Sequence, residues 1–411
     1  MIHVTHKNKS SSKSLPDTRS CNFDDLYPVF SHLNSYLHSH NFRGYEFDDY
    51  LASPVVRFLC FNNLFLQRVA VQIGKLNPIN IRPLLAIPKL ESTKARGFIA
   101  KANLEMYRAT GDAKFLREAE THLQWLLDNP SRGYSGLSWG NAFDFASRGG
   151  FFAKGKPTVV WTAHIAESFD LAYQITGNAK YADVVRRAAD FVVNNLERHV
   201  DSYGLCFGYA PGVLNLVHNS NLLGAATVLR SRKHFPDTPG LEAAAAAYAW
   251  TIAHHCDDGG WYYGAETKYR WKDNFHTAYN IDCFLVGHEL GGESMVPWST
   301  IETSYNFWVK NFFDDDGGPR YFHNRAYPYD IQSASQAIET LLRCEKYFAE
   351  AGALAEKVIH WTIRSMQKKN GAFRFQIRPF WKNNQESLHW GQATTLSALA
   401  MACHRAMKKV D

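Results

Sequence analysis

Short runs of small and apolar residues with helical spacing recur along this chain at almost constant intervals. Five of these runs follow an aromatic, glycine-containing stretch, and equivalent positions in them lie 57, 58, 56 and 57 residues apart. The equivalent positions are Trp161, His218, His276, Gln332 and His389. A sixth run, which starts at Lys94, aligns with the first of the five. A fixed period of this length is typical of a repeat architecture, in which each repeat contributes one supersecondary unit.

A second set of helical segments alternates with these runs. Gly111 and Gly177 indicate short turns between paired helices, because glycine readily adopts the left-handed conformation that ends many helices. The two sets together predict an all-α (α/α)6 toroid of twelve helices in six hairpins, with the recurring runs as inner helices. A further helix near 23–39 is expected to pack outside the ring. The outer helices are predicted over residues 54–74, 113–128, 179–197, 239–255, 297–312 and 350–368.

Short aromatic runs before the inner helices, such as LCFGY and AFRFQI, carry the strand signals of the chain. We expect them to form small β-hairpins at one rim of the toroid. The acidic runs Asp257–Gly260 and Asp314–Gly318 occupy matching places in the repeat and are expected to form turns. Residues 1–20 lack an apolar segment and are expected to be a flexible tail, followed by a single toroid domain over residues 21–411.

The composition and charge of the chain argue against several classes of function. A net charge of only +6, without a run of five basic residues, argues against a nucleic-acid partner. No stretch reaches 18 apolar residues, so no transmembrane segment is expected. Seven scattered cysteines without a CxxC pair indicate buried thiols and a cytoplasmic protein. No metal or other cofactor is expected, because the one compact cluster, His254–Cys256, ends an outer helix away from the predicted mouth.

The loops that lead into the inner helices meet at one end of a toroid, so residues in them converge although they lie far apart in sequence. Residues 43–49 are expected to fold over the same rim. Aromatic faces there suit the C–H face of a pyranose ring, and planar polar groups suit its hydroxyls. The residues expected to bind substrate are Tyr45, Trp139, Asn141, Trp161, Asn219, Tyr263, Glu266, Arg270, Tyr279, Arg320, Tyr329, Gln332, Arg378, Trp381, Glu386 and Trp390.

Two chemistries fit this rim. Inverting hydrolysis of a glycosidic bond needs an acid and a base carboxylate about 6.5–9.5 Å apart. Epimerisation or elimination needs a base and an acid that flank an acidic C–H, and histidine is a natural proton carrier near neutral pH. Each histidine can equally serve only to cap a helix or fill space. The candidate carboxylates are Asp144, Glu266, Asp273, Asp330 and Glu386, and the candidate histidines are His218, His276 and His389.

A family resemblance rests on two motifs and on the Gly-aromatic repeats. The motifs are RGYEFDD at Arg43–Asp49 and NIRPLL at Asn80–Leu85. With them the chain resembles the (α/α)6-toroid carbohydrate-active proteins of bacterial capsule and exopolysaccharide clusters, over most of residues 40–405. This resemblance implies polysaccharide synthesis or processing, with an oligosaccharide, polysaccharide or glycan intermediate as substrate. The segment Gln367–Phe373 is also distantly similar to the repeats of squalene-cyclase and prenyltransferase toroids.

Cleavage of a glycosidic bond by paired carboxylates is the leading prediction, and a sugar or uronate epimerase or lyase is the alternative. Two other classes stay open. A terpenoid-type toroid predicts a deep apolar cavity that contains the Asp314–Asp316 run. A non-catalytic glycan-binding scaffold predicts a filled centre. The sequence does not fix the oligomeric state.

Overall fold

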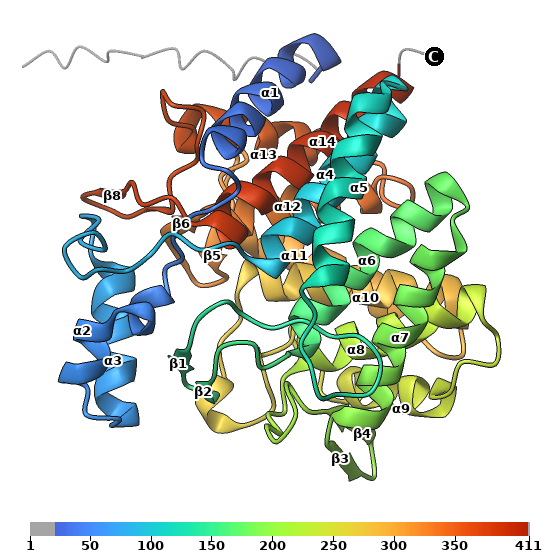
Figure 1. The fold of residues 1–411 in the computed structure, drawn as a ribbon. Helices are drawn as coiled ribbons and strands as arrows, with labels where there is room; N and C mark the ends of the chain where they lie inside the picture. Colours follow the sequence, from blue (N-terminus) through green and yellow to red (C-terminus); the bar gives the residue numbers. More distant parts are fainter. Residues whose placement is uncertain (1–20, 410–411) are drawn as a thin grey trace, which may run out of the picture.

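Two concentric sets of helices form a closed ring (Figure 1) in a computed structural model that describes residues 21–409. The predicted tail at residues 1–20 lies outside the described residues. Each inner helix packs against the next, and the last packs against the first, which closes the ring and confirms the (α/α)6 toroid. The inner helices are α4 (Thr93–Thr110), α6 (Val159–Thr176), α8 (His218–His234), α10 (Asn274–Gly291), α12 (Ile331–Cys344) and α14 (Thr394–Lys408).

The outer set contains one helix that the sequence pattern did not place there. α1 (Phe23–Ser39) packs against α14, in the position predicted for residues 54–74, so that prediction was wrong. Leu26, Phe30, Leu33 and Leu37 of α1 form one buried stripe at helical spacing. The other outer helices are α5 (Ala113–Asp128), α7 (Ala179–Asn195), α9 (Leu241–Ala253), α11 (Trp298–Phe312) and α13 (Ala351–Met366).

Residues 54–76 form a helical hairpin beside the ring. It consists of α2 (Pro54–Leu59) and α3 (Leu64–Leu76), and it follows the short 3-10 helix η1 (Asp49–Ala52). In Figure 1 this hairpin lies at the lower left, away from the outer helices. Only Gln67, Val71 and Gly74 of α3 are buried, so the hairpin covers one flank of the rim instead of completing the ring.

The inner helices begin at the same rim, and side chains cap several of them. Ser92 and Thr158 accept backbone N–H groups of the first turns of α4 and α6, and Asp273 does so for α10. α4 and α6 end at Gly111 and Gly177, both with the left-handed φ that their positions predicted. The rim is thus the end of the ring to which the helix N-termini point.

Small antiparallel sheets lie between the helices of the chain, as predicted. Two hairpins pair β1 (Phe145–Ser147) with β2 (Gly150–Phe152) and β3 (Arg198–Asp201) with β4 (Gly204–Phe207). Pairing between neighbouring repeats builds a third sheet of four strands, which is larger than the sequence suggested. Its strands are β5 (Arg320–Phe322), β6 (Arg325–Asp330), β7 (Gln376–Ile377) and β8 (Lys382–Asn383).

The acidic runs form turns, as predicted. The backbone N–H of Asp314 donates to the carbonyl of Gly318, and the Asp316 carboxylate accepts the N–H of Gly318. The second run repeats this pattern, because the Asp258 carboxylate accepts the N–H of Gly260. None of the helices in residues 21–409 combines the length and the apolar character that crossing a membrane requires.

Candidate functional site

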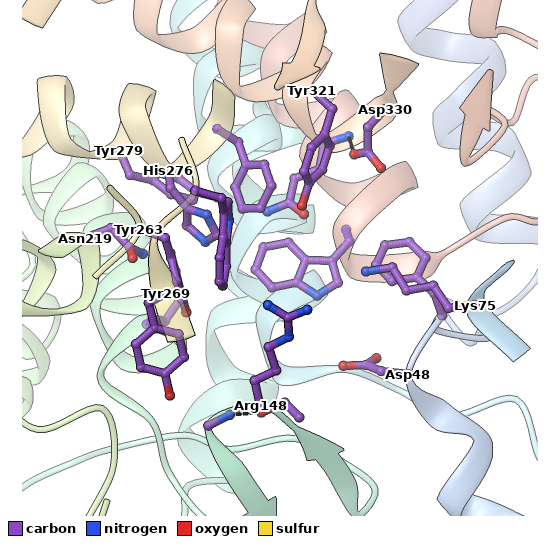
Figure 2. Close-up of a pocket in the computed structure, with 18 of the residues that line it drawn as sticks. Asp48, Lys75, Arg148, Asn219, Tyr263, Tyr269, His276, Tyr279, Tyr321 and Asp330 are labelled. Carbon is purple, nitrogen blue, oxygen red and sulfur yellow. Dashed lines mark hydrogen bonds between the residues drawn. The ribbon is translucent and has the colours of Figure 1, made fainter. Parts of the chain in front are cut away.

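A cavity of about 610 Å³ lies at the rim where the inner helices begin (Figure 2). This volume lies within the range of small-molecule sites. The first turns of α8, α10 and α12 contribute to its wall, as does the π-helical turn η3 (Leu388–Ala393) before α14. Phe47 and Asp48 also contribute, so the segment 43–49 reaches the rim as expected. The predicted site residues in the wall are Asn219, Tyr263, His276, Tyr279, Asp330, Gln332 and Trp390.

Flat aromatic rings make up much of the wall. Tyr263 stacks on Trp271 with ring centroids 4.7 Å apart, and its ring lies 4.4 Å from that of His276. Trp390 lies edge-on to Trp161, which is buried behind it, at a centroid distance of 5.6 Å. Exposed aromatic faces of this kind can stack on the C–H face of a sugar.

His276 is held in one orientation by a buried carboxylate. Its Nδ1 lies 2.7 Å from Oδ2 of Asp273, and Asp273 itself is almost completely buried. A carboxylate only accepts hydrogen bonds, so Nδ1 carries the proton and donates it to Asp273. The same Oδ2 accepts the indole N–H of Trp271 at 2.8 Å, which fixes the carboxylate. The lone pair of Nε2 is therefore free to take a proton from a molecule in the cavity.

Two carboxyl groups lie in the same wall. Burial raises the pKa of Asp48 and of Asp330. Asp330 accepts the N–H of Gln332 at 2.9 Å and a side-chain N–H of Gln376 at 2.7 Å. Asp48 lies across the cavity from His276 (Figure 2). Carboxyl groups of raised pKa can donate a proton near neutral pH.

Three cations in the wall have no ion-pair partner within residues 21–409. They are Lys75 of α3, Arg148 of the β1–β2 turn and Arg325 of β6. The Arg148 guanidinium points into the middle of the cavity, between the Tyr263 side and the Asp48 side (Figure 2). Each lies over an aromatic ring, but a cation without an ion-pair partner can still bind an anionic group on a ligand.

Five buried polar atoms of the wall also lack a hydrogen-bond partner in the described part of the chain. They are Oδ1 of Asp48, Oδ1 of Asn219, the hydroxyls of Tyr269 and Tyr279, and Nε2 of Gln332. Burying a polar group without a partner costs free energy, and such groups in a cavity are commonly completed by a ligand or water. Together they offer hydrogen-bond donors and acceptors that match sugar hydroxyls.

Of the five carboxylates predicted for glycosidic cleavage, only Asp330 lies in the cavity wall. Asp273 lies behind His276, where it orients the imidazole ring. Asp144 pairs with Arg57 at 3.2 Å and accepts the backbone N–H of Lys154. These contacts hold Asp144 outside the wall.

The other predicted residues outside the wall are held by local contacts. Glu386 accepts the Tyr36 hydroxyl at 2.6 Å, and Arg320 and Tyr329 both bind the Asp314 carboxylate at a separate surface hollow. Glu266 pairs with its neighbour Lys268. The further residues in this group are Tyr45, Trp139, Asn141, Trp161, Arg270, Arg378 and Trp381.

His389 supports the wall from behind. Its Nδ1 lies 2.8 Å from the Glu46 carboxylate, and its backbone N–H donates to the same oxygen at 2.6 Å. The imidazole ring is fully buried and packs edge-on against Trp390 at 5.1 Å. We therefore assign His389 to the orientation of Trp390 and not to contact with a ligand.

His218 lies in the interface between α8 and α9, against the rings of Trp250 and His254. Burial lowers the pKa of His218 to about 3, so its imidazole is neutral at physiological pH. Its ring is outside the cavity wall. This placement removes it from the proton-transfer candidates.

His218 should make the fold sensitive to acid. The pKa of His218 is about 3 in the folded chain and about 6.5 in the unfolded chain. Between about pH 3 and pH 6.5 the unfolded state therefore binds a proton that the folded state does not. Stability is therefore lost as the pH falls below about 6.5, by roughly 2 kcal/mol at pH 5. Urea unfolding at pH 7 and pH 5 should show a smaller acid loss for His218→Gln than for the wild type. An equal loss in both proteins would show that His218 does not titrate on unfolding.

Several residues of the wall were not selected from the sequence. Lys75 was missed because residues 54–74 were expected to be an outer helix. Asp48, in the segment 43–49, and Arg148 were expected near the rim, but they were not selected as site residues because the helical period does not define the path of their loops. No group of three or more His, Cys, Asp and Glu side chains in residues 21–409 is arranged to hold a metal ion.

Comparisons with known proteins show the fold. The sequence matches no protein-family model and no curated protein. Among solved structures, a possible member of the GH105 family from Klebsiella pneumoniae aligns over 100% of both chains, with a TM-score of 0.62 and 10% identity. A GH76 alpha-mannanase from Bacteroides thetaiotaomicron covers 78% of this chain and 88% of its own, with a TM-score of 0.61 and 12% identity. Cellobiose 2-epimerase from Bacillus thermoamylovorans covers 79% and 90%, with a TM-score of 0.59 and 13% identity.

Proposed function

We propose that the chain is a carbohydrate-active enzyme that transfers a proton at a carbon atom of an acidic sugar, as an epimerase or a lyase does. The observation that carries this proposal is the His276–Asp273 pair at 2.7 Å, with the second imidazole nitrogen of His276 in an aromatic cavity. A histidine oriented by a buried carboxylate is a recurrent arrangement for a general base. The geometry thus favours the alternative chemistry over the one that leads on sequence grounds.

The proposed step moves one proton and one electron pair. Nε2 of His276 takes the proton from a carbon next to a carbonyl or carboxylate group of the sugar. The C–H electron pair moves toward that group, and Arg148 offsets the negative charge that develops there. Return of a proton to the opposite face of the carbon, from the Asp48 carboxyl across the cavity, gives an epimer, and exchange with water restores Asp48 and His276. Departure of a substituent from the neighbouring carbon with its bonding electron pair gives an unsaturated sugar instead.

The cavity supports a substrate that is both a carbohydrate and an anion. Aromatic rings and unpartnered polar atoms suit the sugar ring, while Lys75, Arg148 and Arg325 suit a carboxylate or phosphate group. Sugar epimerases and glycoside hydrolases are among the proteins that share the fold. Together with the RGYEFDD and NIRPLL motifs, this supports a role in bacterial capsule or exopolysaccharide synthesis. All seven cysteines are free thiols, which supports a cytoplasmic location.

Hydrolysis of a glycosidic bond is the second candidate. Asp48 and Asp330 both line the cavity, and burial raises the pKa of each. In this reaction one carboxyl would protonate the leaving oxygen while the other activates water. Asp48 was not among the carboxylates selected from the sequence.

Incubation with a panel of uronic-acid-containing and neutral oligosaccharides in heavy water separates these reactions by product mass. An epimer that carries one carbon-bound deuterium, or an unsaturated fragment, would support proton transfer by His276. Fragments that have gained only water would support the carboxyl pair instead. If no glycan of the panel is altered, carbohydrate chemistry in this cavity is disproved for these substrate classes.

Arg148→Gln should weaken the binding of the acidic substrate. Loss of one charge-assisted contact is worth about 1.5–3 kcal/mol, so KM should rise about tenfold to a hundredfold for an acidic sugar. A neutral analogue of the same length should lose much less. Arg186→Gln on the outer helix α7, where the arginine is exposed and pairs with Asp183, is the matched control. Equal losses for acidic and neutral sugars would exclude Arg148 as the anion contact.

A further inference from the structure

The α2–α3 hairpin exposes an unusual number of apolar side chains. Twelve of the 21 large hydrophobic residues that are exposed in residues 21–409 lie between Val55 and Leu84. Phe58, Phe61 and Phe65 are 74%, 75% and 71% exposed. Large apolar side chains that gather in one exposed segment commonly mark an interaction surface. We define the apolar face of the hairpin as Val55, Phe58, Leu59, Phe61, Leu64, Phe65, Leu66, Val69, Ile73 and Leu76.

The charges of this segment all have one sign. Residues 50–90 contain no aspartate or glutamate. Their basic residues are Arg57, Arg68, Lys75, Arg82 and Lys89. Arg82 is buried and neutralised by Asp49, while Lys89 is exposed and Arg68 and Lys75 are partly exposed. Arg57 is paired with Asp144. Arg68, Lys75 and Lys89, which have no ion-pair partner in the described residues, therefore supply the basic charge beside the apolar face, and the segment has no acidic residue of its own.

The hairpin is fastened so that this face points away from the ring. The Tyr50 ring packs against Gly74, where an added Cβ would lie only 2.1 Å from ring atoms, and its hydroxyl donates to the Gly74 carbonyl. The Asn383 side chain donates to the carbonyl of Lys75 at the end of α3. These contacts cover one side of α3 and leave the three phenylalanines of the hairpin in solvent.

We propose that the α2–α3 hairpin docks the protein onto the surface of an anionic lipid bilayer. Helices that lie in the membrane interface combine large apolar side chains with basic residues, and acidic headgroups supply the negative charge that this segment lacks. A second copy of the chain fits the face less well, because two such surfaces would bring like charges together without an acidic partner. The docked face and the candidate site share a helix, since Gln72 and Lys75 of α3 line the cavity.

Flotation with lipid vesicles tests this proposal independently of the reaction in the cavity. Full-length protein should float with vesicles of phosphatidylglycerol and phosphatidylcholine at least tenfold more than with phosphatidylcholine alone. The preference should fall in high salt, because salt screens the attraction between basic side chains and headgroups. The triple variant Phe58→Ser/Phe61→Ser/Phe65→Ser should lose at least tenfold of its bound fraction while keeping the wild-type circular dichroism.

The matched control is Val200→Ser/Leu214→Ser/Phe380→Ser, which removes three exposed apolar side chains elsewhere on the molecule. It should bind vesicles like the wild type. Equal binding to neutral and anionic vesicles, or unchanged binding of the hairpin variant, would overturn the proposal. Wild-type protein that does not bind vesicles would also overturn the proposal. Light scattering would then show whether the protein forms a dimer that covers the apolar face, and whether the hairpin variant disrupts that dimer.

Discussion

Asp273→Asn should lower kcat of the proposed reaction about 10³- to 10⁴-fold with little change in KM, on the pattern of other carboxylate-oriented histidines. The carboxylate accepts a hydrogen bond from the Nδ1–H group of His276 and so keeps Nε2 unprotonated toward the cavity. An asparagine can present an N–H to Nδ1 instead, which favours the tautomer whose Nε2 carries the proton. Asparagine still caps a helix, so the start of α10 should remain intact.

Steady-state kinetics of the wild type, Asp273→Asn and His276→Gln on one substrate measure this effect. The two variants should lose similar amounts of activity, because both remove the same base. Asp112→Asn is the matched control, since Asp112 also caps a helix by accepting a backbone N–H but lies on the outer helix α5. If Asp273→Asn keeps more than about a tenth of the activity, the tautomer argument is wrong.

Arg82→Met should lower the free energy of unfolding by about 3–5 kcal/mol, the usual cost of removing one partner from a buried ion pair. Arg82 is only 1% exposed. Its Nε donates to Asp49 at 2.7 Å, and its Nη1 donates to Gln385 at 2.6 Å. Its guanidinium also lies over the Tyr50 ring at 4.6 Å. Without Arg82 the Asp49 carboxyl would be buried with no cation beside it.

Urea unfolding of the single variants and of Arg82→Met/Asp49→Asn tests this assignment. The double variant should recover part of the loss, because it removes the carboxylate that was left without a partner. Arg186→Met, which breaks the exposed pair with Asp183, should cost less than about 1 kcal/mol. A double variant that is no more stable than Arg82→Met would show that the pair itself is not the source of the loss.

This pair also explains why two separate sequence motifs belong together. Asp49 closes the RGYEFDD motif, and Arg82 is the arginine of NIRPLL. Glu46 of the first motif binds His389 and Ser387, which brings the start of the last inner helix to the same place. The two motifs thus assemble the side of the rim that carries Asp48 and Lys75.

The sequence predicted the ring well, because its period and its helix-ending glycines reflect contacts that every repeat must make. It predicted the site less well, because equal sequence spacing does not give equal helical phase. His218 is the first residue of α8, whereas His276 is the third residue of α10. A shift of two residues turns a side chain by about 200° around a helix. His276 consequently lies in the cavity wall, while His218 packs against α9.

The hairpin was misplaced for a different reason. α3 is amphipathic, with polar residues such as Arg68 and Gln72 on one side and apolar residues on the other, and such an apolar face is expected to pack against the ring. In the structure most of that face is exposed to solvent. α1 has an apolar stripe of the same kind, and it is this stripe that packs in the ring beside α14.

Transfer of solvent deuterium to carbon is the most direct test of the central claim, that His276 is a base acting on a sugar C–H. A reactive acidic sugar from the panel is incubated in heavy water with wild type, His276→Gln or Asp112→Asn, and carbon-bound deuterium is read by mass and NMR. We expect either label next to the carbonyl or carboxylate group or an unsaturated product with wild type and Asp112→Asn, and neither with His276→Gln. A saturated product without carbon-bound deuterium, or equal labelling or elimination by His276→Gln, would contradict the claim.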